Sequence, residues 1–123
     1  MSTNYMHLVA WGGTTHTTPA DEAHILTIPG CPNPMMAISL QAVVLTAATT
    51  AATPILETFE ASPTVLATVT IGTSAARTIV GPVLVTEANR QIAASISLRV
   101  RESTGGDGTA VYAITAVTTY NWV

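Results

Sequence analysis

The stretch from Gln91 to Val123 constrains the fold more than any other part of the chain. Between Ile92 and Arg101, apolar residues occupy every second position, which is the period of a half-buried β-strand. The run 109–120 is rich in Val, Ile, Thr and Tyr, and the glycine-rich run 103–108 separates the two. This pattern predicts a long antiparallel hairpin. Because an isolated hairpin is only marginally stable in water, earlier strands must cover its apolar face.

Six earlier segments have strand-like composition, and turn residues separate them. The predicted strands are residues 5–11, 24–28, 36–46, 55–61, 64–71 and 77–85. Gly12 and Gly13 are expected to end the first, and Pro29 the second. The segment 55–61 also fits a helical turn.

The segment 77–85 is interrupted at Gly81-Pro82. Since proline lacks a ladder donor, this interruption indicates a sheet edge or a bulge.

The chain is predicted to be all-β. About eight strands with no amphipathic helix indicate one antiparallel β-sandwich or jelly-roll-like domain, assigned here to residues 21–123. Residues 1–20 are predicted to form an extended N-terminal arm or clasp. The segment 5–11 is apolar on both sides, which fits a strand that adds to a neighbour's sheet.

Aromatic residues gather near the two ends of the chain. They can cap the core or anchor a contact, since Trp and Tyr are enriched at interface hot spots. The predicted partner-contact residues are Tyr5, Leu8, Val9, Trp11, Tyr120 and Trp122.

Charge is scarce throughout the sequence. Only 9% of the residues are charged, no lysine occurs, and the net charge is −3; an average soluble domain is about 25% charged. We interpret this as a surface that is largely covered in use, and a threonine-faced sandwich in free solution is the alternative. The absence of a basic patch argues against nucleic-acid binding. No apolar run is long enough to predict a membrane span.

The N-terminal sequence lacks the pattern of a secretory signal. The single cysteine, Cys31, has no partner for an internal disulfide. Both observations predict a protein made in a cytoplasm.

No residue pattern predicts catalysis, a metal or a cofactor. The three histidines have no zinc-site spacing, and no cysteine pair accompanies them: His7, His16 and His24. Cys31 lies among prolines and is interpreted as a buried, inert thiol. Glu57 and Glu60 would need a cleft between them to act as acid and base. The turn 105–108 holds one carboxylate, too few for calcium, and is interpreted as a plain hairpin turn. We therefore expect that the chain is not an enzyme.

Arg99 and Arg101 are predicted on the exposed face of their strand. Their acidic partners are expected within the chain or across a subunit boundary, and the sequence offers three candidates: Glu57, Glu60 and Glu87.

Three segments have a shared texture rich in Ala, Thr, Val and Gly: LATVTIGTSAART, SISLRVREST and TGGDGTAVYAITAV. In this texture, and in its open N-terminal segment, the chain resembles the small virion proteins of tailed bacteriophages, especially the capsid decoration or cement proteins. The resemblance implies a sandwich or jelly-roll-like protein, often a homotrimer. Such a protein is made in the host cytoplasm and sits on the outer capsid surface. There it clamps neighbouring copies of the major capsid protein.

Two other classes of function remain open at this point. One is a carbohydrate- or receptor-binding module of a phage tail or fibre, in which Trp11 or Trp122 would be an exposed stacking platform. The other is a subunit of a different ordered assembly, such as a tail tube.

Overall fold

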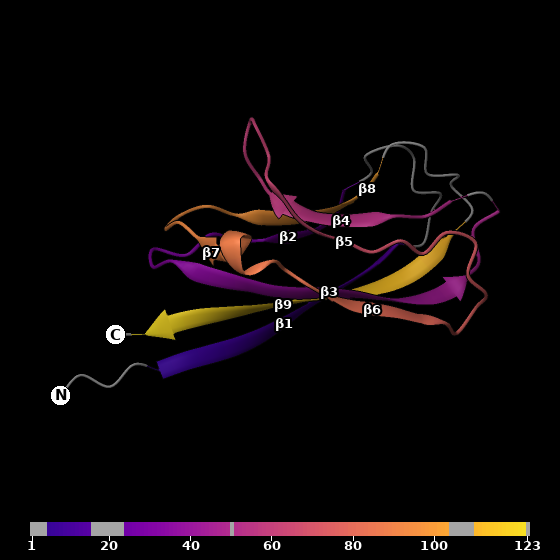
Figure 1. Cartoon of the computed structure of the whole chain (residues 1–123), viewed down its shortest axis with the longest axis horizontal. Helices are drawn as coiled ribbons and strands as arrows, with labels where there is room; N and C mark the ends of the chain where they lie inside the picture. The colour runs from indigo at the N-terminus through magenta and orange to yellow at the C-terminus, as the bar shows by residue number, and fades with distance from the viewer. Residues whose placement is uncertain (1–4, 16–23, 50, 104–109, 123) are drawn as a thin grey trace.

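The chain forms a β-sandwich of two antiparallel sheets packed face to face (Figure 1). The computed structural model describes residues 5–15, 24–49, 51–103 and 110–122. The five-stranded sheet, here called sheet A, has the order β1-β9-β3-β6, with β7 also paired to β3; the four-stranded sheet B has the order β2-β8-β4-β5. The all-β sandwich prediction is confirmed.

The three longest strands, β1, β3 and β9, all belong to sheet A. Sheet A consists of β1 (Tyr5–Thr15), β3 (Met35–Thr46), β6 (Ile79–Leu84), β7 (Gln91–Ile92) and β9 (Val111–Trp122). Sheet B consists of β2 (His24–Ile28), β4 (Pro54–Thr58), β5 (Val65–Thr68) and β8 (Leu98–Glu102). A single 3-10 turn, η1 (Glu87–Asn89), precedes β7.

The core lies between the two sheets and is built from alternate positions of each strand. In β3 and β9 the inward side chains include Leu40, Val44 and Tyr112, all of them fully or almost fully buried. Leu98 and Val100 of β8 are fully buried against them from sheet B. In β8, the period of two in the sequence therefore reports correctly that Leu98 and Val100 face the core.

The predicted hairpin of the last two strands is wrong. β8 pairs with β2 and β4 in sheet B, whereas β9 pairs with β1 and β3 in sheet A. The two strands thus face each other across the core and share no ladder. The alternating pattern requires only that one side of each strand contact apolar neighbours. Two strands meet this requirement equally well as neighbours in one sheet or as strands that face each other across the sandwich. The predicted turn over residues 105–108 lies outside the described residues.

The predicted strand 92–101 is also wrong as a single element. β7 ends at Ile92 and β8 begins at Leu98. Between them Ser95 has a φ of 68°, a left-handed conformation that no strand contains. The Ser95 N–H donates to the Cys31 carbonyl at 2.6 Å, which ties this turn to the segment after β2.

Several predicted elements are confirmed with small changes of boundary. β2 ends directly before Pro29, β3 covers the predicted 36–46, and the segment 55–61 supplies the strand β4. β6 is an edge strand, and its pairing with β3 shifts register opposite Gly81-Pro82. The proline predicted a sheet edge or a bulge, and β6 has both.

The N-terminal strand is longer than predicted. β1 continues through Gly12 and Gly13 to Thr15, because it pairs with β9 along its whole length without a register shift. Residues 5–15 of the predicted arm are therefore an edge strand of the chain's own sheet. In Figure 1, β1 and the end of β9 run side by side toward the two chain termini.

Backbone atoms pack closely around Gly30, so a substitution there tests the turn at Ser95. This turn interrupts the predicted strand 92–101. A Cβ added at Gly30 would lie 2.7 Å from the carbonyl carbon and oxygen of Ser95. We expect Gly30→Ala to lower the free energy of unfolding by about 1–3 kcal/mol, because backbone must move. Gly12→Ala is the control, since a Cβ there has no neighbour closer than 3.9 Å. Urea unfolding measures both variants, and equal losses would contradict the close approach.

Candidate functional site

The outward-facing side of sheet A carries no ionic side chain. The strands β1, β3, β6, β7 and β9 contain no Asp, Glu, Lys or Arg. All the acidic and arginine side chains of the chain therefore belong to sheet B or to connecting segments. An antiparallel sheet whose outer side faces water usually alternates apolar residues with polar or charged ones.

Register identifies the side chains on the outer face of sheet A. The partners Met36↔Thr119 and Val43↔Ile79 lie on this side, and so does Leu84 opposite Ser39. The face also carries side chains of β1 and β9: Leu8, Ala10, Ala113, Thr115 and Val117.

Large apolar side chains on this face are open to solvent. Leu8 is 71% exposed, Ile79 61% and Leu84 60%. Among the described residues, seven large hydrophobic side chains are exposed, and five of these belong to strands of sheet A. Leu8, Ile79 and Leu84 share this face, with β9 and β3 between Leu8 and the other two.

The predicted partner-contact residues divide between the two sides of sheet A. Leu8 lies on the outer face, whereas Val9 and Trp11 point toward the core side and are half-buried. Trp11 packs against the core, and its indole N–H donates to the Thr118 hydroxyl at 3.0 Å. Tyr120 also packs against the core, where burial raises its pKa.

Two of these predicted residues, Tyr5 and Trp122, are register partners at the end of the sheet. Their side chains lie outside the described part of the structure. The sequence prediction missed Met36, Ile79 and Leu84, whose common face becomes visible only when the register of three strands is known.

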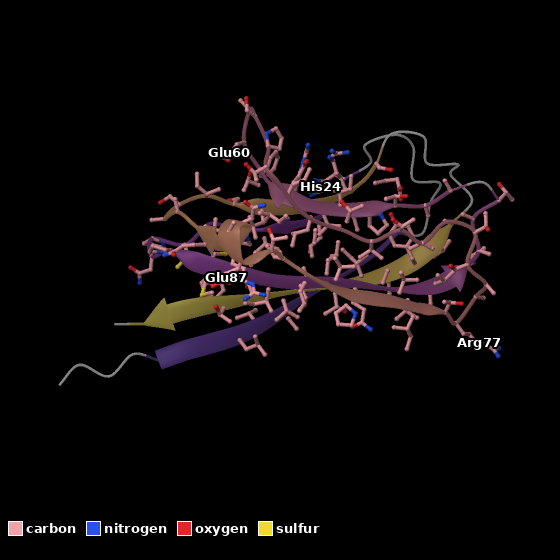
Figure 2. The ribbon with its side chains drawn as sticks, in the orientation of Figure 1. His24, Glu60, Arg77 and Glu87 are labelled. Carbon is pink, nitrogen blue, oxygen red and sulfur yellow. The ribbon has the colours of Figure 1, made fainter. Side chains whose placement is uncertain are left out.

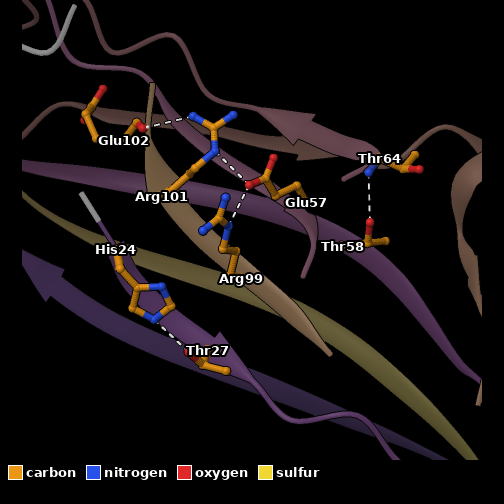
Figure 3. A network of polar contacts seen from close by, with 8 residues as sticks. All are labelled: His24, Thr27, Glu57, Thr58, Thr64, Arg99, Arg101 and Glu102. Carbon is orange, nitrogen blue, oxygen red and sulfur yellow. Dashed lines mark hydrogen bonds and ion pairs between the residues drawn. The ribbon is translucent and has the colours of Figure 1, made fainter. Parts of the chain in front are cut away.

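The outer side of sheet B has the opposite character (Figure 3). Glu57 of β4 is 1% exposed, and its Oε1 accepts hydrogen bonds from the Nε atoms of Arg99 and Arg101, both at 2.7 Å. Of the three acidic partners proposed from the sequence, the structure selects Glu57. Register explains the choice, because Glu57 lies directly opposite Arg99, and Ile55 opposite Arg101.

Aromatic rings extend this polar cluster. The Arg99 guanidinium carbon lies 5.1 Å from the centroid of the Phe59 ring, within cation–π distance. The His24 ring lies 6.1 Å from the same ring and shares a 2.7 Å hydrogen bond with the Thr27 hydroxyl. His24 is thus held by a threonine and an aromatic ring.

The environment of Glu57 disfavours a general-acid role for this carboxyl. Burial alone raises the pKa of this carboxyl, but the hydrogen bonds and charges of Arg101 and Arg99 outweigh burial, and the pKa lies below its ordinary value. A general acid at neutral pH needs the opposite shift. In the Glu57–Glu60 pair considered from the sequence, Glu57 is therefore a carboxylate that does not hold a proton.

A second polar contact crosses the core between the two sheets. The Tyr112 hydroxyl of β9 donates to Oε2 of the fully buried Glu102 of β8, and the Thr53 N–H donates to Oε1 of the same carboxylate. Burial, with Glu102 adding to it, raises the pKa of Tyr112. Sequence analysis missed this contact, although Glu102 has the same alternation phase as Leu98 and Val100.

Other kinds of site find little support in the described residues. No three His, Cys, Asp or Glu side chains gather there in a way that could hold a metal ion. Cys31 is a free thiol and half-buried, less enclosed than predicted. A pocket of about 260 Å³ is lined by Glu60, Asn89, Gln91 and neighbouring residues. Figure 2 places Glu60 in the projecting loop beyond β4. None of the helical segments described here has the length and apolarity to cross a membrane.

No protein-family model matches the chain, and no curated protein matches it.

The Glu57 cluster predicts a pH-dependent stability. Glu57→Gln should lower the free energy of unfolding at pH 7 by about 1–3 kcal/mol, because two partly buried arginines lose their ionic partner. The folded pKa is lowered, so this stabilisation is present above the ordinary Glu pKa of about 4.3 and is lost as the pH falls through the folded value. Urea unfolding from pH 7 to pH 3 measures it.

The control for this prediction is Glu60→Gln, at an exposed position near the same strand. That variant should follow the wild-type protein at each pH. A wild-type minus Glu57→Gln difference that stays constant down to pH 3 would contradict the assignment.

Proposed function

We propose that this protein is a structural subunit that packs the outer face of sheet A against a neighbouring protein in a larger assembly. The observation that carries the proposal is the complete absence of ionic residues from the strands of sheet A, together with the exposure of Leu8, Ile79 and Leu84 on its outer side.

Burying such a face is energetically simple. No charged group has to leave water, so the desolvation penalty that opposes burial of ions does not arise. Each large aliphatic side chain that becomes fully covered contributes about 1.5–3 kcal/mol. The face is a sheet surface with broad, shallow contacts, which suits adhesion to another protein better than capture of a small ligand.

The two sides of the sandwich differ in a way that orients the subunit. Arg99, Arg101 and His24 lie on the outer side of sheet B, where the two arginines are partly buried around Glu57 and His24 is exposed. A protein with one apolar side and one charged side fits the surface of a shell, with sheet A against the shell and sheet B toward solvent.

The specific assembly that we propose is the head of a tailed bacteriophage. Here the protein is a capsid decoration or cement protein that bridges subunits of the major capsid protein on the outer surface. This assignment combines the two-sided character of the sandwich with the resemblance of its sequence to small virion proteins. The resemblance implies a homotrimer, and the solution mass of the purified protein tests that implication.

The carbohydrate-binding alternative receives no support from Trp11. A stacking platform needs an exposed ring, and Trp11 is half-buried with its indole N–H bonded to Thr118. We therefore retain the structural role as the proposed function.

The proposal predicts that a charge on the outer face of sheet A prevents attachment. Capsids assembled without this protein, from the virus that encodes it, serve as the binding partner in co-sedimentation. The double variant Ile79→Glu with Leu84→Glu should bind at least about tenfold more weakly, because two carboxylates would have to leave water.

Val65→Glu is the matched control, since Val65 is 47% exposed on sheet B. Circular dichroism checks that each variant is folded. Equal weakening by Val65→Glu, or no binding of the wild-type protein, would contradict the proposal.

A further inference from the structure

The edges of the two sheets are not equally protected against pairing with another strand. β6, at one edge of sheet A, contains Pro82 and a register shift against β3. In sheet B, the edge strand β2 has five residues and a register shift, and the edge strand β5 has only four residues. Short strands, prolines and bulges are the usual devices that keep sheet edges from joining.

The edge strand β1 has none of these devices. It is eleven residues long, it contains no proline and no acidic residue, lysine or arginine, and it pairs with β9 without any register shift. Within the part of the chain that the structure describes, β1 has a strand on one side only. A long, regular, uncharged edge is a template for strand addition.

The hydrogen bonds of β3 show which of its residues direct their backbone N–H and C=O groups toward β6 and which toward β9. The Val44 N–H donates to the Thr78 carbonyl at 2.9 Å, and the Val44 carbonyl accepts from the Arg77 N–H at 2.7 Å. Val44 therefore points toward β6. Because neighbouring residues of an antiparallel strand point to opposite sides, Val43 points toward β9, where its partner is Ala113.

The same alternation extends across β9 to the edge. Since Ala113 points toward β3, Ile114 points toward β1 and bonds with its partner Gly13. The next residue, Gly12, then points outward. The N–H and C=O groups directed away from the sheet are thus those of the even-numbered residues of β1: Met6, Leu8, Ala10, Gly12 and Thr14.

We propose that two copies of this chain join through β1, antiparallel and about a twofold axis that passes beside Ala10. The full overlap of the two eleven-residue strands sets this register, with Ala10 opposite Ala10 of the second copy. Every outward N–H and C=O of the five even-numbered residues then has a partner. The result is one continuous sheet that runs through both copies, from the β6 edge of one to the β6 edge of the other.

The side chains in this register are complementary to themselves, which is why the partner is a second copy. Leu8 lies opposite Gly12 of the other strand, and by the twofold axis Gly12 lies opposite Leu8. A Cβ built on Gly12 finds no neighbour within 3.9 Å, so the space beside it can receive the exposed leucine. On the outer face of the pair, a large residue thus meets a glycine.

Charge does not oppose the pairing. A twofold contact brings every charge opposite its own copy, and a strand with Lys or Glu near its centre would repel itself. β1 offers no such repulsion. The pairing is independent of the proposed capsid contact, because it uses the edge of sheet A and leaves the outer face open on both copies.

Cross-linking through an introduced cysteine tests the register. All variants carry Cys31→Ser, because Cys31 is a free thiol. Ala10→Cys should form a disulfide-linked dimer with oxidised glutathione, since directly opposite Cα atoms of a hydrogen-bonded pair are about 5.5 Å apart. Leu8→Cys should not, since residue 8 and its copy are offset by four residues, roughly 13 Å along the strand. Non-reducing electrophoresis reads both.

Solution mass tests the pairing itself. Light scattering over a range of concentrations should give a dimer for the wild-type protein. Ala10→Pro removes one outward N–H without touching the bonds to β9 and should weaken dimerisation at least about tenfold. Ala10→Thr keeps the N–H, and its side chain is similar in size to that of proline. This variant should therefore remain a dimer.

Three results would overturn the inference. One is a wild-type protein that is monomeric, or that is trimeric and forms no oligomer with an even number of copies. Another is a dimer in which Ala10→Cys does not cross-link, or in which Leu8→Cys cross-links equally well. The third is an Ala10→Pro variant that stays folded by circular dichroism and dimerises as the wild type does.

Discussion

The packing of β8 against β9 across the two sheets is the constraint on which the rest of the sandwich depends. Leu98 and Val100 are buried from one side, and Tyr112 and Ile114 from the other. At the end of this contact Tyr112 donates to the buried carboxylate of Glu102, so the sheets share a polar bond as well as an apolar interior. A buried carboxylate without partners would be costly, and here the backbone N–H of a neighbouring loop residue also reaches it.

That arrangement determines which sheet carries charge. Once Leu98, Val100 and Glu102 face inward, Arg99 and Arg101 must face outward on sheet B, where Glu57 binds both. The long strands of sheet A provide no comparable ion pair, and their outer side has only apolar and small polar residues. The low charge of the chain is therefore unevenly distributed, and composition alone does not reveal this.

Alternation predicted the class of fold and most strand positions, but not the pairing of the strands. The sequence places Leu98 and Val100 on a buried side, and both are buried. It cannot distinguish a neighbour in the same sheet from a strand facing across the core, so the hairpin prediction failed. Proline chemistry was more specific, since Gly81-Pro82 indicated the edge and the bulge that β6 has. The outer face of sheet A could not be predicted, because only register shows that Leu8, Ile79 and Leu84 share one face.

The absence of lysine is relevant both to the uncharged outer face of sheet A and to its edge strand β1. Exposed edge strands are commonly kept apart by lysine, because each added strand would have to bury an ammonium group beside the ladder. A chain without lysine has lost that protection and must use short strands, prolines or bulges, as β2, β5 and β6 do. β1 uses none of these, and it borders the same uncharged face. An unprotected edge beside an apolar face is a liability for a free monomer, whereas in a subunit that is covered in use both features serve assembly.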